Sequence, residues 1–230
     1  LHSVTTALGS QYFVKAAIIC TGTYLNGRVI TGEYTRSAGP DGMLPATEFS
    51  ASLIREGIRL MRFKTGTPVR IHRDSIDYSA LEKQENETDI TPFSSRTDPH
   101  LFAGRQQTSC YIAYTNENTH DIIRSNLHRS PLYSGVIHGT GPRYCPSIED
   151  KIVRFSDKKR HQLFVEPMGE NTAEIYLQGF SSSLPIDVQT QMLHSLRGFE
   201  HAHIMRYAYA IEYDCVDPTQ MLHTLEFKNI

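Results

Sequence analysis

Near the start of the chain, apolar residues form one segment and one stripe at helical spacing. One mainly apolar segment, Val14 to Cys20, predicts a buried strand of a parallel or mixed sheet. Residues 21–23 then form the turn that leaves this strand, where cofactors often bind in doubly wound folds. Residues 45–61 carry apolar side chains at helical spacing, which predicts a helix that ends near Gly57.

The next segments predict a strand and a loop. Residues 60–71 are typical of a strand that Gly66 and Pro68 break, and we expect the chain to change domain near here. Residues 74–105 are rich in Glu, Asn, Thr and Ser and show little periodicity. They predict a long exposed loop.

The second half of the chain alternates more regularly. Residues 110–114 predict a half-buried strand, and Thr119 or an adjacent residue caps a helix that follows it. Residues 185–198 carry an apolar stripe that predicts a second helix, and residues 209–218 predict a final strand. Three further short segments predict antiparallel strands: residues 151–157, 162–169 and 173–180.

Composition limits the kind of protein that the chain can be. Its 230 residues, 39% of them hydrophobic, suit one large globular domain or two small ones. The net charge of −2 gives no overall attraction to nucleic acid or membranes. No run approaches the roughly 18 apolar residues that a membrane span needs, so we expect a cytoplasmic protein without a membrane partner. The abrupt first and last residues lead us to expect a portion of a longer protein.

The four cysteines are few and widely spaced, which fits a reducing compartment rather than a disulfide framework. Cys20, Cys110 and Cys215 lie in apolar strand patterns, and we expect each to be structural and without chemistry. Cys145 lies instead among prolines and charged residues, in "GTGPRYCPSIEDK", residues 139–151. Such neighbours are unusual for a cysteine of the core.

A thiolate at Cys145 has several stabilising groups nearby in the sequence. Arg143 and Lys151 supply positive charge, which favours the ionised and nucleophilic form of a thiol. Ser147, followed by two acidic residues, predicts the start of a helix, whose free N–H groups favour an anion. A small buried cysteine with no reactivity remains the alternative.

Other candidate motifs are weaker. Gly139 and Gly141 do not complete a dinucleotide-binding fingerprint. His201 and His203 lack further ligands, so we predict no metal site. The basic residues between positions 154 and 160 are explained equally well by phosphate binding and by a solvated turn. The remaining acid pair, Glu212 and Asp214, is compatible with a base or a ribose-binding role, although capping or salt bridging is the commoner role of such residues.

Two segments resemble the signatures of a known family. Residues 141–155, "GPRYCPSIEDKIVRF", and residues 196–214, "LRGFEHAHIMRYAYAIEYD", resemble those of the glucose-inhibited division protein A family. Members of this family are tRNA uridine 5-carboxymethylaminomethyl modification enzymes. Four shorter segments also resemble the family, in the right order: "ICTGTYLNG", "FKTGTPVRI", "CYIAYTNENTH" and "SPLYSG".

This resemblance implies a fold. The chain would be α/β and part of a two-dinucleotide-binding-domain flavoprotein, with an inserted NAD-binding domain of mixed sheet and helices. Residues 1–67 would be part of the FAD-binding domain and residues 68–205 the inserted domain. Residues 206–230 would return to the FAD-binding domain.

The resemblance also implies a function. It implies FAD and NADH as cofactors, methylenetetrahydrofolate as the one-carbon donor, tRNA as the substrate, a partner GTPase and a homodimeric parent protein. The product would be a carboxymethylaminomethyl group on carbon 5 of the wobble uridine, and we expect the isolated fragment to be inactive. Two alternatives remain: a folate- and FAD-dependent tRNA uridine methyltransferase, and a non-catalytic module that docks tRNA or NAD.

Finally, the resemblance implies a site. Cys145 would be one of two functional cysteines, and its thiolate would add to carbon 6 of the uracil or to a flavin-bound methylene group. Arg143 and Lys151 would accompany the thiolate or bind phosphates, and Glu149 or Asp150 would orient groups. The expected cofactor-binding residues are Gly141, Pro142, Arg143, Tyr144, Cys145, Pro146, Ser147, Ile148, Glu149, Asp150 and Lys151, together with Thr21, Gly22 and Thr23 near the flavin.

Overall fold

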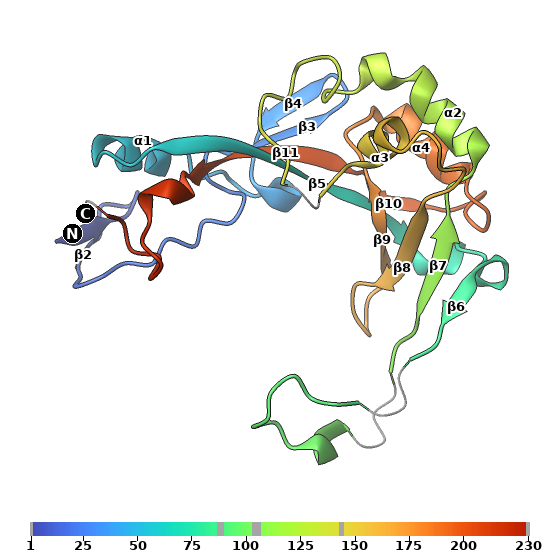
Figure 1. Ribbon diagram of the computed structural model, residues 1–230, viewed down its shortest axis with the longest axis horizontal. Helices are drawn as coiled ribbons and strands as arrows, with labels where there is room; N and C mark the ends of the chain where they lie inside the picture. The colour runs from blue at the N-terminus through green and yellow to red at the C-terminus, as the bar shows by residue number, and fades with distance from the viewer. Residues whose placement is uncertain (1, 87–89, 103–106, 143–144, 229–230) are drawn as a thin grey trace. The chain divides into compact units, whose positions relative to one another are not determined.

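The computed structural model describes residues 2–86, 90–102, 107–142 and 145–228 (Figure 1). The chain forms two compact units: unit 1 is Leu1–Val29, Arg36–Phe63 and Ile211–Ile230, and unit 2 is Ile30–Thr35 and Lys64–Ala210. Four strands contain residues of both units: β3 (Arg28–Thr31), β4 (Tyr34–Ser37), β5 (Leu60–His72) and β11 (Tyr209–Val216). Within the described ranges, no helix has the length and apolarity needed to cross a membrane.

An antiparallel sheet forms the framework of unit 2. Its strands are hydrogen-bonded in the order β5-β9-β8-β7-β6, and β10 pairs with β5. The additional strands are β6 (Glu82–Gln84), β7 (Cys110–Tyr114), β8 (Gln162–Pro167), β9 (Glu174–Ser181) and β10 (Ile204–Arg206). The predictions of an α/β chain and of strands at 110–114, 162–169 and 173–180 are therefore confirmed.

Helices α2 (Glu117–Ser125), α3 (Ile148–Arg154) and α4 (Ile186–His194) lie beside the β7-β8-β9 ladder (Figure 1). Their buried apolar side chains join those of alternate strand residues in one large core. Shorter 3-10 turns complete unit 2: Arg73–Ser75, Tyr78–Ala80, Pro99–Phe102 and Leu127–Arg129.

Two predictions about the helices of unit 2 need correction. The cap of α2 is Asn116, whose side chain accepts a hydrogen bond from the Thr119 backbone N–H at 3.0 Å. Residues 151–157 were predicted as a strand, but most of them belong to α3 and the turn after it. The buried residues Ile148 and Ile152 are four positions apart, which is the period of a helix face.

The strand and loop predicted between residues 60 and 105 are also partly wrong. Strand β5 runs unbroken through Gly66 and Pro68, and its pairing with β9 instead becomes irregular between Pro68 and Arg70. This bulge is where a sheet accommodates a proline, which has no N–H to donate. The predicted loop contains β6, whose Glu82 and Gln84 pair with β7.

Unit 1 contains a hairpin, a helix and a small apolar cluster. Strands β1 (Ser3–Thr5) and β2 (Gln11–Phe13) pair antiparallel, and α1 spans Thr47–Arg55. Gly57 follows α1 with a φ of +80°, which confirms the predicted end of this helix. The buried apolar residues of the cluster are Leu25, Leu53 and Ile58. Short 3-10 turns occur at Pro40–Gly42 and Pro218–Gln220.

The strand predicted from Val14 to Cys20 is wrong. These residues are irregular and mostly exposed, and Ile18 is 90% exposed. The only backbone bond of this run given by the described residues joins the Val14 N–H to the His2 carbonyl. An apolar run becomes a buried strand only where neighbouring strands satisfy its backbone groups. The expectation that Cys20 is a structural core residue fails for the same reason, because this cysteine is exposed.

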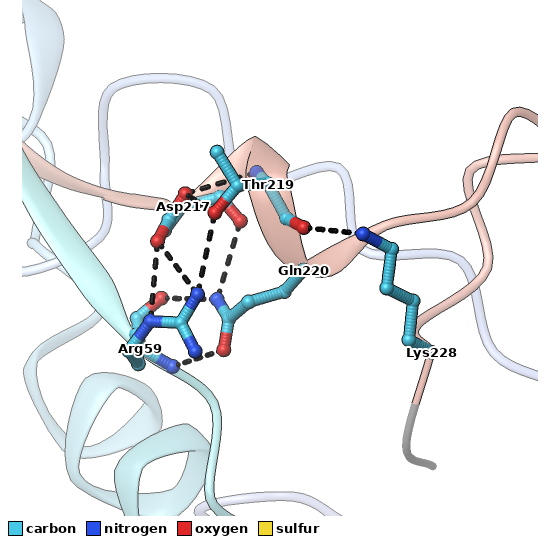
Figure 2. Close-up of polar contacts among 5 residues, drawn as sticks. All are labelled: Arg59, Asp217, Thr219, Gln220 and Lys228. Carbon is cyan, nitrogen blue, oxygen red and sulfur yellow. Dashed lines mark hydrogen bonds and ion pairs between the residues drawn. The ribbon is translucent and has the colours of Figure 1, made fainter.

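Polar contacts around Arg59 hold the last described residues of unit 1 (Figure 2). The guanidinium of Arg59 donates to Asp217 Oδ2 at 3.0 and 3.2 Å and to Thr219 Oγ1 at 3.3 Å. The backbone of Arg59 also exchanges two 2.8 Å hydrogen bonds with the Gln220 side chain. Lys228 Nζ then donates to the Thr219 carbonyl at 2.8 Å. This segment is therefore held mainly by polar groups.

Candidate active site

The segment predicted to carry chemistry leads directly into helix α3. Ser147 is the cap of this helix, and its Oγ accepts a hydrogen bond from the Asp150 backbone N–H at 3.3 Å. The predicted helix start is thus confirmed. Ile148 is buried and fixes α3 against the core, whereas Gly141 and Pro142 are exposed. The predicted residues Arg143 and Tyr144 lie outside the described residues.

Cys145 is half-buried and contacts strand β5. Its Sγ lies 3.3 Å from Thr65 Oγ1, and either atom can donate the hydrogen bond. The Lys64 backbone N–H, also on β5, donates to the Thr140 carbonyl at 3.0 Å. Strand β5 therefore holds the Cys145 segment by a backbone bond and a side-chain bond, neither of which the sequence predicted.

Lys151 lies close enough to Cys145 for their charges to interact. Its Nζ donates to the Gly179 carbonyl at 3.1 Å. Burial lowers the pKa of Lys151, and the neighbouring Cys145 thiolate acts in the opposite direction by favouring the charged amine. A partly desolvated amine beside a thiol is suited to exchanging a proton with it or to stabilising its anion.

Gly179 makes room for this amine. The residue has a φ of +91°, and an added Cβ would lie 3.2 Å from Lys151 Nζ and 3.3 Å from the Gln162 carbonyl oxygen. It also interrupts the alternation of β9, so that Leu177 and Phe180 are both buried although they are three residues apart. A glycine inside a predicted strand was the sequence signal for this close approach.

Glu149 is a fully buried carboxylate. Its Oε1 accepts hydrogen bonds from Ser182 Oγ at 2.9 Å and from the Ser183 N–H at 3.0 Å. Its Oε2 is buried and has no hydrogen-bond partner among the described residues. A buried acceptor of this kind is costly unless a donor reaches it, so Glu149 is suited to binding an N–H or O–H group.

Asp150 faces different partners. Tyr133 Oη donates to Asp150 Oδ1 at 3.4 Å, and Arg154 Nε lies 3.7 Å from the same oxygen. Burial, followed by the negative charges of Asp150 and Glu149, raises the pKa of Tyr133 to about 12. The two adjacent carboxylates therefore differ: Glu149 is buried with a free oxygen, and Asp150 is paired.

The turn predicted to approach a flavin belongs to unit 1. The Tyr24 N–H donates to the Thr21 carbonyl at 3.0 Å, and Gly22 adopts a φ of +51°, so the predicted turn is present. An added Cβ on Gly22 would meet only Tyr24 Cδ2, at 3.9 Å. The open side of Gly22 allows a ligand to approach the backbone closely.

The weaker candidates have structural roles or lie in solvent. Glu212 accepts hydrogen bonds from Arg28 at 2.6 and 3.0 Å, and Asp214 pairs with Arg62 at 2.9 Å, as expected for structural acids. The exposed Arg160 lies over the Tyr114 ring at 4.2 Å. The other weaker candidates are exposed to solvent: His201, His203, Arg154, Lys158 and Lys159.

The whole chain is similar to members of one protein family. The family model described as "Glucose inhibited division protein A" matches residues 1–230. The tRNA uridine 5-carboxymethylaminomethyl modification enzyme MnmG of Clostridium botulinum strain Okra is 56% identical over 230 residues, all of this chain and 36% of that protein. The enzyme of the same name from Caldicellulosiruptor saccharolyticus is 55% identical over 227 residues, 99% of this chain and 36% of that protein.

Solved structures give the same result. The chain is similar to Aquifex aeolicus GidA in its form I crystal, with a TM-score of 0.90 and 47% identity over 99% of this chain and 39% of that one. The form II crystal gives a TM-score of 0.88 and 44% identity over 99% of this chain and 36% of that one. The chain thus spans little more than a third of the length of the relatives that it matches.

Proposed function

Because the chain belongs to the glucose inhibited division protein A family, we propose that it is part of an enzyme that modifies the wobble uridine of tRNA. The observation that supports this most strongly is the half-buried Cys145, between a β5 hydroxyl and a partly desolvated lysine, in a chain 56% identical to a tRNA modification enzyme throughout its length. Fold alone would not carry a function, so the proposal rests on the surroundings of this cysteine together with the similarity of the chain.

In this proposal Cys145 is the nucleophile. The lone pair of its sulfur forms a bond to carbon 6 of the uracil, and the electrons of the C5–C6 double bond move through carbon 5 toward the 4-carbonyl oxygen. Carbon 5 then becomes nucleophilic and would form a bond to the methylene carbon of the one-carbon donor, as one carbon–nitrogen bond of that carbon breaks and its electron pair stays on the nitrogen of the departing tetrahydrofolate. Loss of the proton from carbon 5 and departure of the thiolate restore the double bond. Lys151 stabilises the thiolate before addition and after departure.

The described residues are chemically suited to the cofactors of the family. The unpartnered Oε2 of Glu149 is an acceptor of the kind that binds a carboxamide N–H or a ribose hydroxyl, as NADH carries, and because this oxygen is buried, a cofactor would reach it only after neighbouring side chains move. The Thr21–Thr23 turn, with the open side of Gly22, suits backbone contacts to FAD. When bound, FAD and NADH supply the redox chemistry, and methylenetetrahydrofolate supplies the carbon.

The proposal assigns residues 1–67 and 206–230 to an FAD-binding domain and residues 68–205 to an inserted NAD-binding domain. The whole protein would act in the cytoplasm as a homodimer with a partner GTPase.

The test is replacement of Cys145 by serine in the full-length protein. A bacterial strain that lacks its own enzyme would receive the wild-type protein, Cys145→Ser or the matched control Cys110→Ser, and its tRNA nucleosides would be identified by mass spectrometry. We expect the modified wobble uridine with the wild type and with Cys110→Ser, because burial raises the pKa of the half-buried Cys110 thiol and so disfavours its nucleophilic thiolate. Full modification by Cys145→Ser would refute the role of this thiol, and 5-methyluridine as the product would indicate the methyltransferase instead.

A further inference from the structure

Thr65 forms a hydrogen bond with the sulfur of Cys145. The two residues are eighty positions apart in the sequence, and their Oγ1 and Sγ atoms lie 3.3 Å apart. Both belong to unit 2. The contact therefore depends on the fold of this unit and not on the local sequence around the cysteine.

The position of the Thr65 hydroxyl is fixed by its surroundings. Threonine is branched at Cβ, so its side chain has few rotamers. The neighbouring Lys64 N–H bonds to the Thr140 carbonyl at 3.0 Å, and β5 pairs with β9 from Pro68 onward. Both sides of the hydroxyl–sulfur contact are thus attached to the same strand.

Helix α3 and strand β5 each carry charged residues near the sulfur of Cys145. Lys151 on α3 is the described titratable group whose charge interacts with the Cys145 thiolate, and it already donates to the Gly179 carbonyl. On β5, Lys64 is buried and adjacent to Thr65 in sequence. On the same helix as Lys151, Asp150 instead pairs with Tyr133 and Arg154.

We propose that Thr65 is a positioning residue for Cys145: its hydroxyl donates a hydrogen bond to the ionised sulfur and directs the remaining sulfur lone pairs toward the substrate. A hydroxyl donor favours the thiolate over the thiol, as any hydrogen bond to a charged form does. The inference rests on the proposed function of Cys145, but the ionisation of the thiol can be measured without tRNA.

The experiment follows the alkylation of Cys145 by iodoacetamide in the full-length protein as a function of pH, with mass spectrometry of the peptide that contains Cys145. Thr65→Val keeps the shape of the side chain and removes the hydroxyl. We expect alkylation below the thiol pKa to become about tenfold slower, as expected for loss of one charge-assisted hydrogen bond. Thr65→Ser should restore the wild-type profile, and Thr65→Ala should reproduce the shift.

Thr190→Val is the matched control. The Thr190 hydroxyl donates to the Ile186 carbonyl in α4, and no hydrogen bond joins it to Cys145 among the described residues. The pH dependence of Cys145 alkylation in Thr190→Val should therefore equal that of the wild type. An unchanged profile in Thr65→Val, or a shift that Thr65→Ser fails to reverse, would overturn the proposal. If the shift occurs but Cys145→Ser still modifies tRNA, the positioning contact stands and the proposed role of the thiol in catalysis falls.

Discussion

The two units of the chain are stabilised by different kinds of contact. Among the described residues, unit 2 contains a cluster of twenty buried apolar residues that joins its sheet to its helices. The largest apolar cluster that the described residues form within unit 1 contains three buried residues. The β3, β5 and β11 residues of unit 1 are joined by the ion pairs Arg28–Glu212 and Arg62–Asp214. Apolar burial depends little on pH, whereas an ion pair is lost when either partner changes its charge.

This difference suggests why the candidate nucleophile lies in unit 2. A thiol whose ionisation matters needs neighbours that stay in place, and the elements around Cys145 are fixed by buried residues such as Ile148, Ile152 and Phe180. A dense core transmits small displacements instead of absorbing them. The position of the Lys151 amine beside Gly179 depends on this packing.

The largest effect is expected in the core of unit 2. Phe180→Ala removes a fully buried ring and should destabilise unit 2 by about 3–5 kcal/mol. Hydrogen exchange with mass spectrometry should show faster exchange in the β8 and β9 peptides. Phe164→Ala, at a half-buried position of β8, is the control and should cost much less. If hydrogen exchange became equally faster in the α1 peptide of unit 1, the two units would not be stabilised separately.

A smaller effect is expected from the ion pairs of unit 1. Glu212 is only 2% exposed and accepts two hydrogen bonds from Arg28. Glu212→Gln keeps the shape but removes the negative charge opposite the Arg28 guanidinium, which should cost about 2 kcal/mol because the buried end of the ion pair is lost. Exchange in the β3 and β11 peptides reports this loss, and Glu56→Gln, an exposed position of the same unit, should change nothing. A loss no larger than that of the control would mean that the pair does not stabilise unit 1.

Much of unit 2 could be predicted from the sequence because its elements are local. The cap at Ser147, the strands β8 and β9 and the helix α4 each follow from a period or a capping residue within a few positions. One local failure lies in unit 2, where residues 151–157 were predicted as a strand and mostly belong to α3. The other failures occur where tertiary context decides. The run from Val14 to Cys20 is apolar but lacks strand partners among the described residues, and β5 continues through Pro68 because a bulge accommodates it.

The candidate site was predictable only in part. The sequence drew attention to Cys145, Lys151 and Glu149, which lie within one short segment. It could not identify Thr65, because nothing in a single sequence pairs two residues eighty positions apart. It also treated Glu149 and Asp150 as equivalent, whereas burial distinguishes them: one is enclosed by Ser182 and Ser183 and the other is paired.

The smallest effect is expected at the surface of unit 1, where Arg59 is 64% exposed (Figure 2). Arg59→Ala removes its side-chain bonds to Asp217 and Thr219 but keeps the backbone bonds to Gln220, so it should cost less than Glu212→Gln. Hydrogen bonds from Thr219, and then from Arg59, hold the pKa of Asp217 below its ordinary value of 3.8. A carboxylate with a depressed folded-state pKa stabilises the fold above the unfolded value, and this contribution is lost as the pH falls through the folded value.

The difference between wild type and Arg59→Ala should therefore be present near neutral pH, shrink as the pH falls below 3.8, and decrease in high salt. Thermal unfolding at several pH values checks this, with Arg55→Ala, an exposed arginine in the last turn of α1, as the control. A difference that persists in acid would show that the arginine stabilises this segment through packing of its aliphatic stem. Unit 1 would then depend on apolar contact as unit 2 does, and the contrast between the two units would be one of degree.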